Sequence, residues 1–211
     1  MKIPNALLNF HEHNLSYDLL ELKEFNDVME NFLKTANHAT SQETQEHFRN
    51  LPLALDDEQI SFSPNFKNLL RSSNLTSIIT VTEINLKSFC DSLLIRSHSM
   101  FFFKDLKGNS DFEKIKVVLN KTEFVDFQTI EREWTFIDNS RLIRNKFVHN
   151  NGIITGNHND FNRITDFVNK NPDLFEKHLE HGKYYHIKIK KEFIYKLIET
   201  IFKLIEKIKH Q

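Results

Sequence analysis

The chain has little of what interrupts helices, with four glycines and four prolines among 211 residues. It also has a single cysteine, Cys90, so an internal disulfide is impossible, which is typical of a reducing compartment. No stretch reaches the roughly 18 apolar residues needed to span a bilayer, and the first residues lack the apolar run of a secretory signal. We therefore expect a cytoplasmic protein built from long, uninterrupted elements.

The chain also lacks a charge of one dominant sign. Its 28 basic and 29 acidic residues give a formal net charge of −1. A general basic field that would attract nucleic acid is therefore absent. If the protein touches RNA, we expect it to do so at a local site.

Apolar residues at helical spacing dominate what is present. A first helix is predicted from Asn14, with a stripe formed by Leu15, Leu19, Leu22, Phe25, Val28 or Met29, and Phe32. The pattern weakens over residues 37–48, which indicates a more exposed continuation or a second short helix. Residues 51–65 contain two prolines, and their apolar residues do not recur at a regular spacing. They are therefore predicted to form a loop.

Five further helices and one hairpin are predicted beyond this loop. The helices cover residues 66–98, 110–121, 126–150, 161–171 and 191–210, with residues 154–160 as a loop. Around Gly182, residues 184–189 alternate in polarity, which predicts a small β-hairpin near residues 174–189. The sequence thus predicts an all-α bundle of long antiparallel helices, with this hairpin as an addition, in a single domain over residues 1–211.

The stretch "RLIRNKFVHNNG", residues 141–152, places charge at the end of an amphipathic helix. The apolar stripe of Ile130, Trp134 and Ile137 continues at helical spacing into polar positions, which are Arg141, Arg144 and Asn145, and then reaches Val148. A buried guanidinium without a partner is costly. These arginines therefore either pair with carboxylates or line a cleft. The first alternative predicts a structural pair between Arg141 and Glu83, which lies on the apolar stripe of residues 66–98.

His149 lies four residues after Asn145 and shares a helix face with it. Arg144 and His149 are five residues apart and diverge by roughly 140° in a regular helix. They would contact one ligand together only if the last turn of the helix unwinds. Asn and Gly favour such unwinding because both tolerate left-handed backbone. The alternative is that His149 caps the helix end and stabilises the fold, with Gly152 at the left-handed cap position.

This stretch resembles a known motif. "RNKFVH" followed by "NNG" at a helix end resembles the Arg-x(4–6)-His motif of HEPN domains. These are helical domains of prokaryotic toxin–antitoxin and defence systems, many of them metal-independent endoribonucleases. "SIITVTEINLKSFCDSLL" is similar to the long helix of that family that carries an inward glutamate, and the short "FEKIKVVLNK" helix also fits. The resemblance covers about residues 66–152, with the segments on either side as additions.

The resemblance implies a toxin or phage-defence effector that cleaves RNA without a cofactor or metal. The resemblance also implies a homodimer that brings two motif helices into one cleft, and an antitoxin or regulatory protein that restrains it. Histidine exchanges protons near neutral pH, and the planar fork of arginine matches phosphate oxygens. The resemblance therefore implies catalytic roles for Arg144, His149 and Asn145, supporting roles for Arg141 and Glu83, and RNA contacts for Lys146 and Asn150.

Several alternatives stay open at this point. A non-catalytic HEPN-like dimer that binds RNA or a protein fits the near-neutral charge, because RNA affinity depends largely on phosphate contacts. The histidines at 11, 13, 178, 181 and 186 are expected on the surface rather than at a metal. Lysines 183, 188, 190 and 191 are expected on a solvated strand edge rather than on an RNA platform. Cys90 and Trp134 are expected in the core.

Overall fold

The computed structural model describes residues 5–48, 64–122, 125–157 and 159–211. The predicted loop over residues 51–65 therefore falls almost entirely outside the described residues. Pro64 and Asn65, its last two positions, already belong to a helix.

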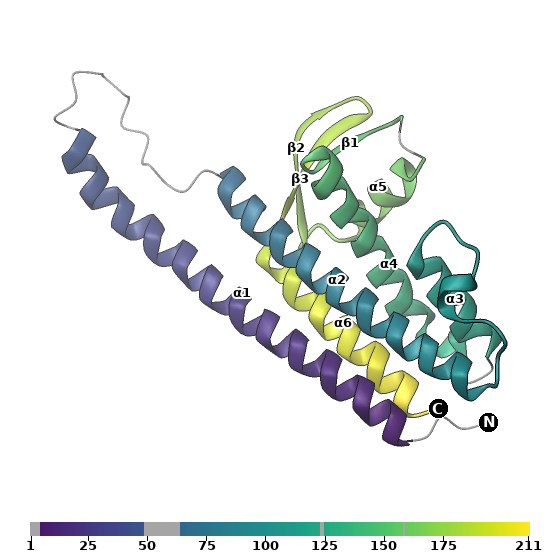
Figure 1. Cartoon of the computed structure of the whole chain (residues 1–211). Coiled ribbons are helices and arrows are strands. Elements are labelled where there is room, and N and C mark those ends of the chain that lie inside the picture. Colours follow the sequence, from purple (N-terminus) through teal and green to yellow (C-terminus); the bar gives the residue numbers. More distant parts are fainter. Residues whose placement is uncertain (1–4, 49–63, 123–124, 158) are drawn as a thin grey trace.

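The described residues form a mostly helical fold with one small antiparallel sheet (Figure 1). Such a fold, with a hairpin near its C-terminal end, is what the sequence predicts. In chain order the elements are α1 (Asn5–Phe48), α2 (Pro64–Arg96), the short 3-10 turn η1 (Phe103–Asp105), α3 (Asp111–Lys121), α4 (Phe127–Asn150), β1 (Ile153–Thr155), α5 (Phe161–Lys170), β2 (Phe175–His181), β3 (Tyr184–Ile189) and α6 (Lys191–Lys209).

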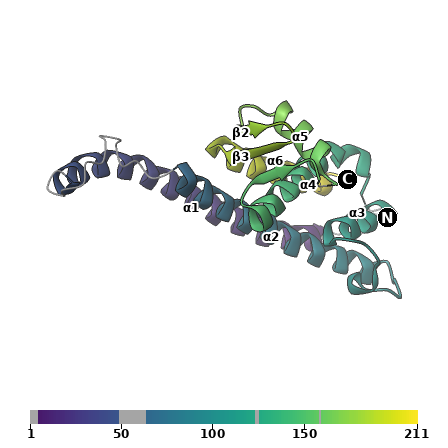
Figure 2. The same cartoon turned by 90° about the horizontal axis from the view of Figure 1, so that it is seen from above.

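The four long helices pack around one apolar core. α2 lies between α1 and α4, while α6 contacts all three of these helices (Figure 1). Seen from above, α1 and α2 run side by side, with the sheet and α5 on the side of α4 and α6 (Figure 2). Cys90 and Trp134 lie in this core, as predicted, among fully buried leucine, isoleucine and phenylalanine side chains.

α1 differs from its prediction in length and in orientation. It begins nine residues earlier than expected and continues to Phe48 without a break, because no glycine or proline interrupts residues 5–48. Its predicted stripe is partly wrong. Of the two alternatives Val28 and Met29, Met29 is the buried one. Phe25 and Phe32 are exposed, and Leu33, which was not predicted, is buried.

The sheet closes the bundle at the end where α4 stops. The strand order is β1-β3-β2, and both pairings are antiparallel. β2 and β3 form the predicted hairpin, whereas β1 lies in a segment predicted to be mostly loop. A strand of three residues is too short to leave a period in the sequence. Its central residue, Ile154, is buried and pairs with Tyr185 on β3.

Candidate functional site

The inward side of α4 is apolar for three turns except for the buried Glu133, and beyond them it is mixed. Ile130, Trp134 and Ile137 are buried, as the sequence predicts. The line continues inward through Ser140, Ile143 and Lys146, all of them buried. The two arginines of the motif are half-buried, and Val148 is exposed.

Arg141 is neutralised within its own helix. Its Nε lies 2.8 Å from an Asp138 carboxylate oxygen, and its guanidinium lies 5.4 Å from the centre of the Phe112 ring on α3. Arg163 on α5 binds the other oxygen of the same carboxylate at 2.7 Å. The predicted pair between Arg141 and Glu83 is therefore wrong, because Asp138, one turn earlier in α4, holds Arg141 against α3.

Arg144 makes the contact with Glu83 instead. Its Nη2 lies 3.4 Å from Glu83 Oε2 across the α2–α4 contact, and the two side chains are 20% and 24% exposed. The Nε of Arg144 is buried and has no hydrogen-bond partner in the described part of the chain. Burial lowers the pKa of this guanidinium, the Glu83 carboxylate opposes that shift, and the nearby Arg141 adds to it. Arg144 is thus an incompletely paired cation at a helix–helix contact.

His149 lies on the exposed side of the last turn of α4, and no hydrogen bond or ion pair holds it within the described residues. The helix remains regular through Asn150, and the backbone becomes left-handed only at Asn151 (φ 50°) and Gly152 (φ 78°). The last turn does not loosen before His149, so within one chain His149 and Arg144 point about 140° apart.

The carbonyl groups at the end of α4 are capped without His149. The Asn151 amide donates to the Phe147 carbonyl at 3.2 Å, and the Gly152 amide donates to the Lys146 carbonyl at 3.0 Å. The Asn151 bond is the five-to-one bond of the left-handed cap that ends many helices, and the Gly152 bond adds to it. The structure therefore does not use His149 as the cap that the sequence allowed, and its imidazole is left available.

The side chains near His149 differ in their exposure to solvent. Asn145 and Asn150 are partly exposed, and Asn145 shares the His149 face of the helix. Lys146 is buried, and its Nζ lies 2.7 Å from Asp160 just before α5. The RNA contact predicted for Lys146 is corrected accordingly, because an ion pair turns this side chain away from the open face.

The sheet supplies a histidine that the sequence did not connect with the motif. His186 on β3 hydrogen-bonds through Nε2 to the Asn151 carbonyl at 2.9 Å, and it pairs across the sheet with Ile153 and His178. His186 and Asn151 are 35 residues apart, and nothing in the local pattern indicates that they meet. The sheet thereby fixes the turn that follows His149.

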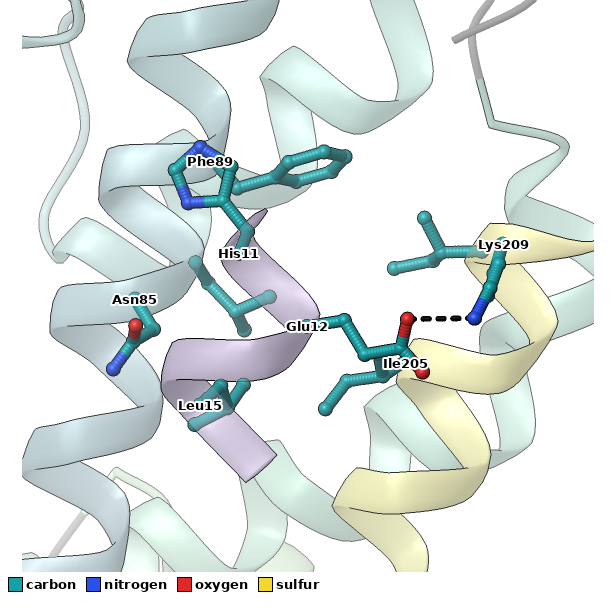
Figure 3. Close-up of a pocket in the computed structure, with 9 residues that line it drawn as sticks. His11, Glu12, Leu15, Asn85, Phe89, Ile205 and Lys209 are labelled. Carbon is teal, nitrogen blue, oxygen red and sulfur yellow. Dashed lines mark hydrogen bonds and ion pairs between the residues drawn. The ribbon is translucent and has the colours of Figure 1, made fainter. Parts of the chain in front are cut away.

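A small cavity lies at the opposite end of the bundle, where α1 begins and α6 ends (Figure 3). Its volume is about 30 Å³, and its lining includes Leu15, Phe89 and Ile205. A carboxylate of Glu12 binds Lys209 at 2.7 Å beside it. A space of this size holds about one water molecule, and no residue of the motif lines it. It therefore offers no site for a nucleotide.

Metal-binding clusters and known relatives give no further assignment. Across residues 5–48, 64–122, 125–157 and 159–211, no three His, Cys, Asp or Glu side chains gather closely enough to hold a metal ion. In the same ranges, none of the helices is long and apolar enough to cross a membrane.

No protein-family model, curated protein or solved structure matches the chain. The resemblance to HEPN domains therefore stays a prediction.

Proposed function

We propose that this chain is a metal-independent endoribonuclease of HEPN type, whose active site is completed by a second copy of the chain. One observation carries the proposal. Arg144 is a half-buried cation with a single long contact to Glu83 and an unpartnered Nε. A guanidinium with unused donors is well suited to a phosphate group, which binds two of them at once. His149 lies on the same helix, exposed and without a competing partner.

The chemistry follows from what RNA supplies. The ribose 2′-hydroxyl attacks the adjacent phosphorus, so that an O2′–P bond forms and the P–O5′ bond breaks. One imidazole takes the 2′-hydroxyl proton, and a second gives a proton to the departing 5′-oxygen. Arg144 stabilises the charge that grows on the phosphate oxygens. The products are a 2′,3′-cyclic phosphate and a 5′-hydroxyl, and atoms balance without water or a metal.

A second copy is needed because one chain offers a single motif histidine that points away from Arg144. A twofold axis near the Glu83–Arg144 contact would bring two such helix ends together. Two exposed apolar side chains lie beside this contact and support the axis. Ile84 follows Glu83 and is 61% exposed, and Val148 precedes His149 and is 53% exposed. Asn145 would then orient the imidazole or the phosphate, and Asn150 would contact the RNA strand.

A second function, RNA or protein binding without cleavage, is favoured by a different observation. No side chain within the described residues orients the His149 imidazole, whereas catalytic bases are usually held by a further group. The same pair of helix ends would then bind a phosphate without transferring protons. In either case we propose a cytoplasmic protein. If it cleaves RNA, we propose that a partner protein restrains it.

Cleavage of RNA in EDTA tests the proposal. Wild type is expected to cleave a mixed-sequence RNA, and His149→Ala and Arg144→Ala are each expected to lose at least 100-fold in rate. The controls are His210→Ala, which removes an exposed histidine, and Arg132→Ala, which removes an exposed arginine of the same helix. Both should cleave like wild type. Equal cleavage by wild type and His149→Ala would end the catalytic assignment, and binding without cleavage would favour the second function.

A further inference from the structure

α1 has a second apolar face, on the side opposite its contacts with α2 and α6 in the described part of the chain. Four large apolar side chains on it are between 54% and 67% exposed. At 100° per residue they fall within one sector of the helix, about 140° wide. We call this surface the α1 outer face, and its members are Tyr17, Leu20, Phe25 and Val28.

The side of α1 that packs against the bundle is only partly apolar. Leu15 and Leu19 are buried against the core, but much of the contact with the bundle is polar. Asn74 donates to Asn26 at 3.0 Å, Arg71 forms a two-pronged pair with Glu30, and Tyr195 on α6 donates to Asp27. These polar pairs determine which side of α1 faces the bundle. The apolar residues of the α1 outer face therefore lie on the opposite, exposed side.

The α1 outer face is separate from the candidate RNA site. Asn85 on α2 contacts Asp18 of α1, whereas Glu83 contacts Arg144 of α4. Two residues span about 200° of a helix, so these contacts lie on nearly opposite sides of α2. A ligand on the α1 outer face therefore does not need the RNA site, and the two surfaces can be tested independently.

The charges around the α1 outer face are of one sign. Asp18, Glu21 and Glu24 flank its apolar residues. Lys23 is the one lysine or arginine between residues 13 and 32, and it is engaged by Asp27 at 3.2 Å. The Tyr17 hydroxyl feels this charge, because a hydrogen bond to Glu21 and the nearby carboxylates raise its pKa.

This charge pattern disfavours a second copy of the chain as the occupant. In a parallel pair of α1 helices the carboxylates would face each other, and like charges in contact are unfavourable. In an antiparallel pair they would be pressed against Phe25 and Val28, where a buried carboxylate without a partner is costly. A partner with lysine or arginine beside its apolar residues meets neither penalty.

The area indicates the size of the occupant. An aromatic side chain presents roughly 150–250 Å², so four large side chains exposed by about half present on the order of 400 Å². A standard interface between globular proteins buries about 800 Å² per partner. The face therefore matches one helix laid along α1, anchored by apolar residues at i, i+3, i+4 and i+7.

We infer that the α1 outer face is a docking site for a basic amphipathic helix of another protein. The probe that tests this is a labelled 18-residue peptide with leucine at i, i+3, i+4 and i+7 and lysine elsewhere, titrated into the full chain by fluorescence anisotropy. Its counterpart carries glutamate in place of lysine. The leucine–lysine peptide should bind at least tenfold more tightly than the leucine–glutamate peptide.

Two pairs of variants locate the binding. The double variant Phe25→Ser/Val28→Ser should weaken binding at least tenfold. Its control is Ile95→Ser/Met100→Ser, which removes two exposed apolar groups, one in the last turn of α2 and one just after it. Glu21→Gln/Glu24→Gln should weaken binding severalfold, against Glu131→Gln/Glu206→Gln as control. Circular dichroism checks that each variant is folded, and amide chemical shifts should move mainly over residues 17–32.

Three results would overturn the inference. The first is equal weakening by the control variants, which means that the peptide binds any apolar spot. The second is equal affinity for the glutamate peptide. The third is a dimer in sedimentation equilibrium that Phe25→Ser/Val28→Ser dissociates, which would assign the face to a second copy. A dimer that the double variant does not dissociate is formed through another surface, and it is compatible with the inference.

Discussion

Arg144 and Arg141 lie one turn apart on α4 and have opposite surroundings. Arg141 is paired with Asp138 at 2.8 Å and lies over Phe112, whereas Arg144 keeps a single contact of 3.4 Å with Glu83. The Arg141 guanidinium joins α4 to α3, whereas the Arg144 guanidinium retains donors for a ligand. Two arginines that look alike in the sequence are therefore expected to respond differently to substitution.

Arg141→Ala should lower stability without lowering cleavage per folded molecule. It leaves Asp138 with Arg163 alone and uncovers Phe112, and we expect a loss of about 1–3 kcal/mol in the free energy of unfolding. Arg144→Ala should change stability less and remove cleavage. Urea denaturation and RNA cleavage on the same samples measure both effects. A reversed order, with Arg144→Ala the less stable and the more active variant, would contradict this division of roles.

Ile84→Glu should dissociate the proposed dimer and remove RNA cleavage together. Its side chain is exposed beside Glu83, so a new carboxylate there would repel its symmetry mate with little effect on the fold. Light scattering after size exclusion gives the mass, and Met100→Glu, at a residue that is 89% exposed, is the matched control. A monomeric Ile84→Glu variant that still cleaves RNA would exclude the composite site.

Gly152→Ala should loosen the turn after His149. Its φ of +78° is strained for alanine, and the added Cβ would lie 2.7 Å from the Phe147 ring. We expect a loss of about 1–3 kcal/mol in the free energy of unfolding. The control is Gly182→Ala, at a positive φ of 60° with no atom within 4 Å of the added carbon. Thermal unfolding should show the larger drop for Gly152→Ala, and equal drops would mean that the Phe147 contact gives way.

His11 should make stability depend on pH below neutrality. The sequence predicted His11 on the surface, but it is buried, because it packs edge-on to Phe89 with its Nε2 3.1 Å from the Ser92 hydroxyl. Burial lowers its pKa from 6.5. The unfolded chain therefore binds this proton more readily than the folded chain. The stabilising contribution is complete above pH 6.5 and is lost as the pH falls from 6.5 towards the folded-state pKa.

His11→Gln removes this titration while keeping a hydrogen-bonding side chain. Wild type should lose more stability than the variant between pH 7.5 and pH 5.5, as measured by urea denaturation at both values. His210→Gln, at an exposed histidine near the C-terminus, should lose as much as wild type. If wild type and His11→Gln showed the same dependence on pH, the histidine would be accessible to protons in the folded state.

The local pattern of residues determined most of the helices and the hairpin. Few glycines and prolines leave long helices intact, and the stripe of Ile130, Trp134 and Ile137 correctly indicated the buried side of α4. Alternation around Gly182 likewise indicated β2 and β3. Such patterns are readable because they repeat every two or every 3.6 residues within one element. The cluster of Arg144, Asn145 and His149 was also visible, because its members lie within six residues.

Only the tertiary structure decided which contacts these elements make. It paired Glu83 with Arg144 instead of Arg141, buried Lys146 against Asp160, and turned Phe25 and Val28 of α1 outward. Each outcome depends on a partner from another element, 61 residues away in the case of Glu83 and Arg144. A helix with apolar residues on two sides does not specify which side is buried. The polar groups of α2 and α6 settled that choice for α1, since buried polar atoms must find partners.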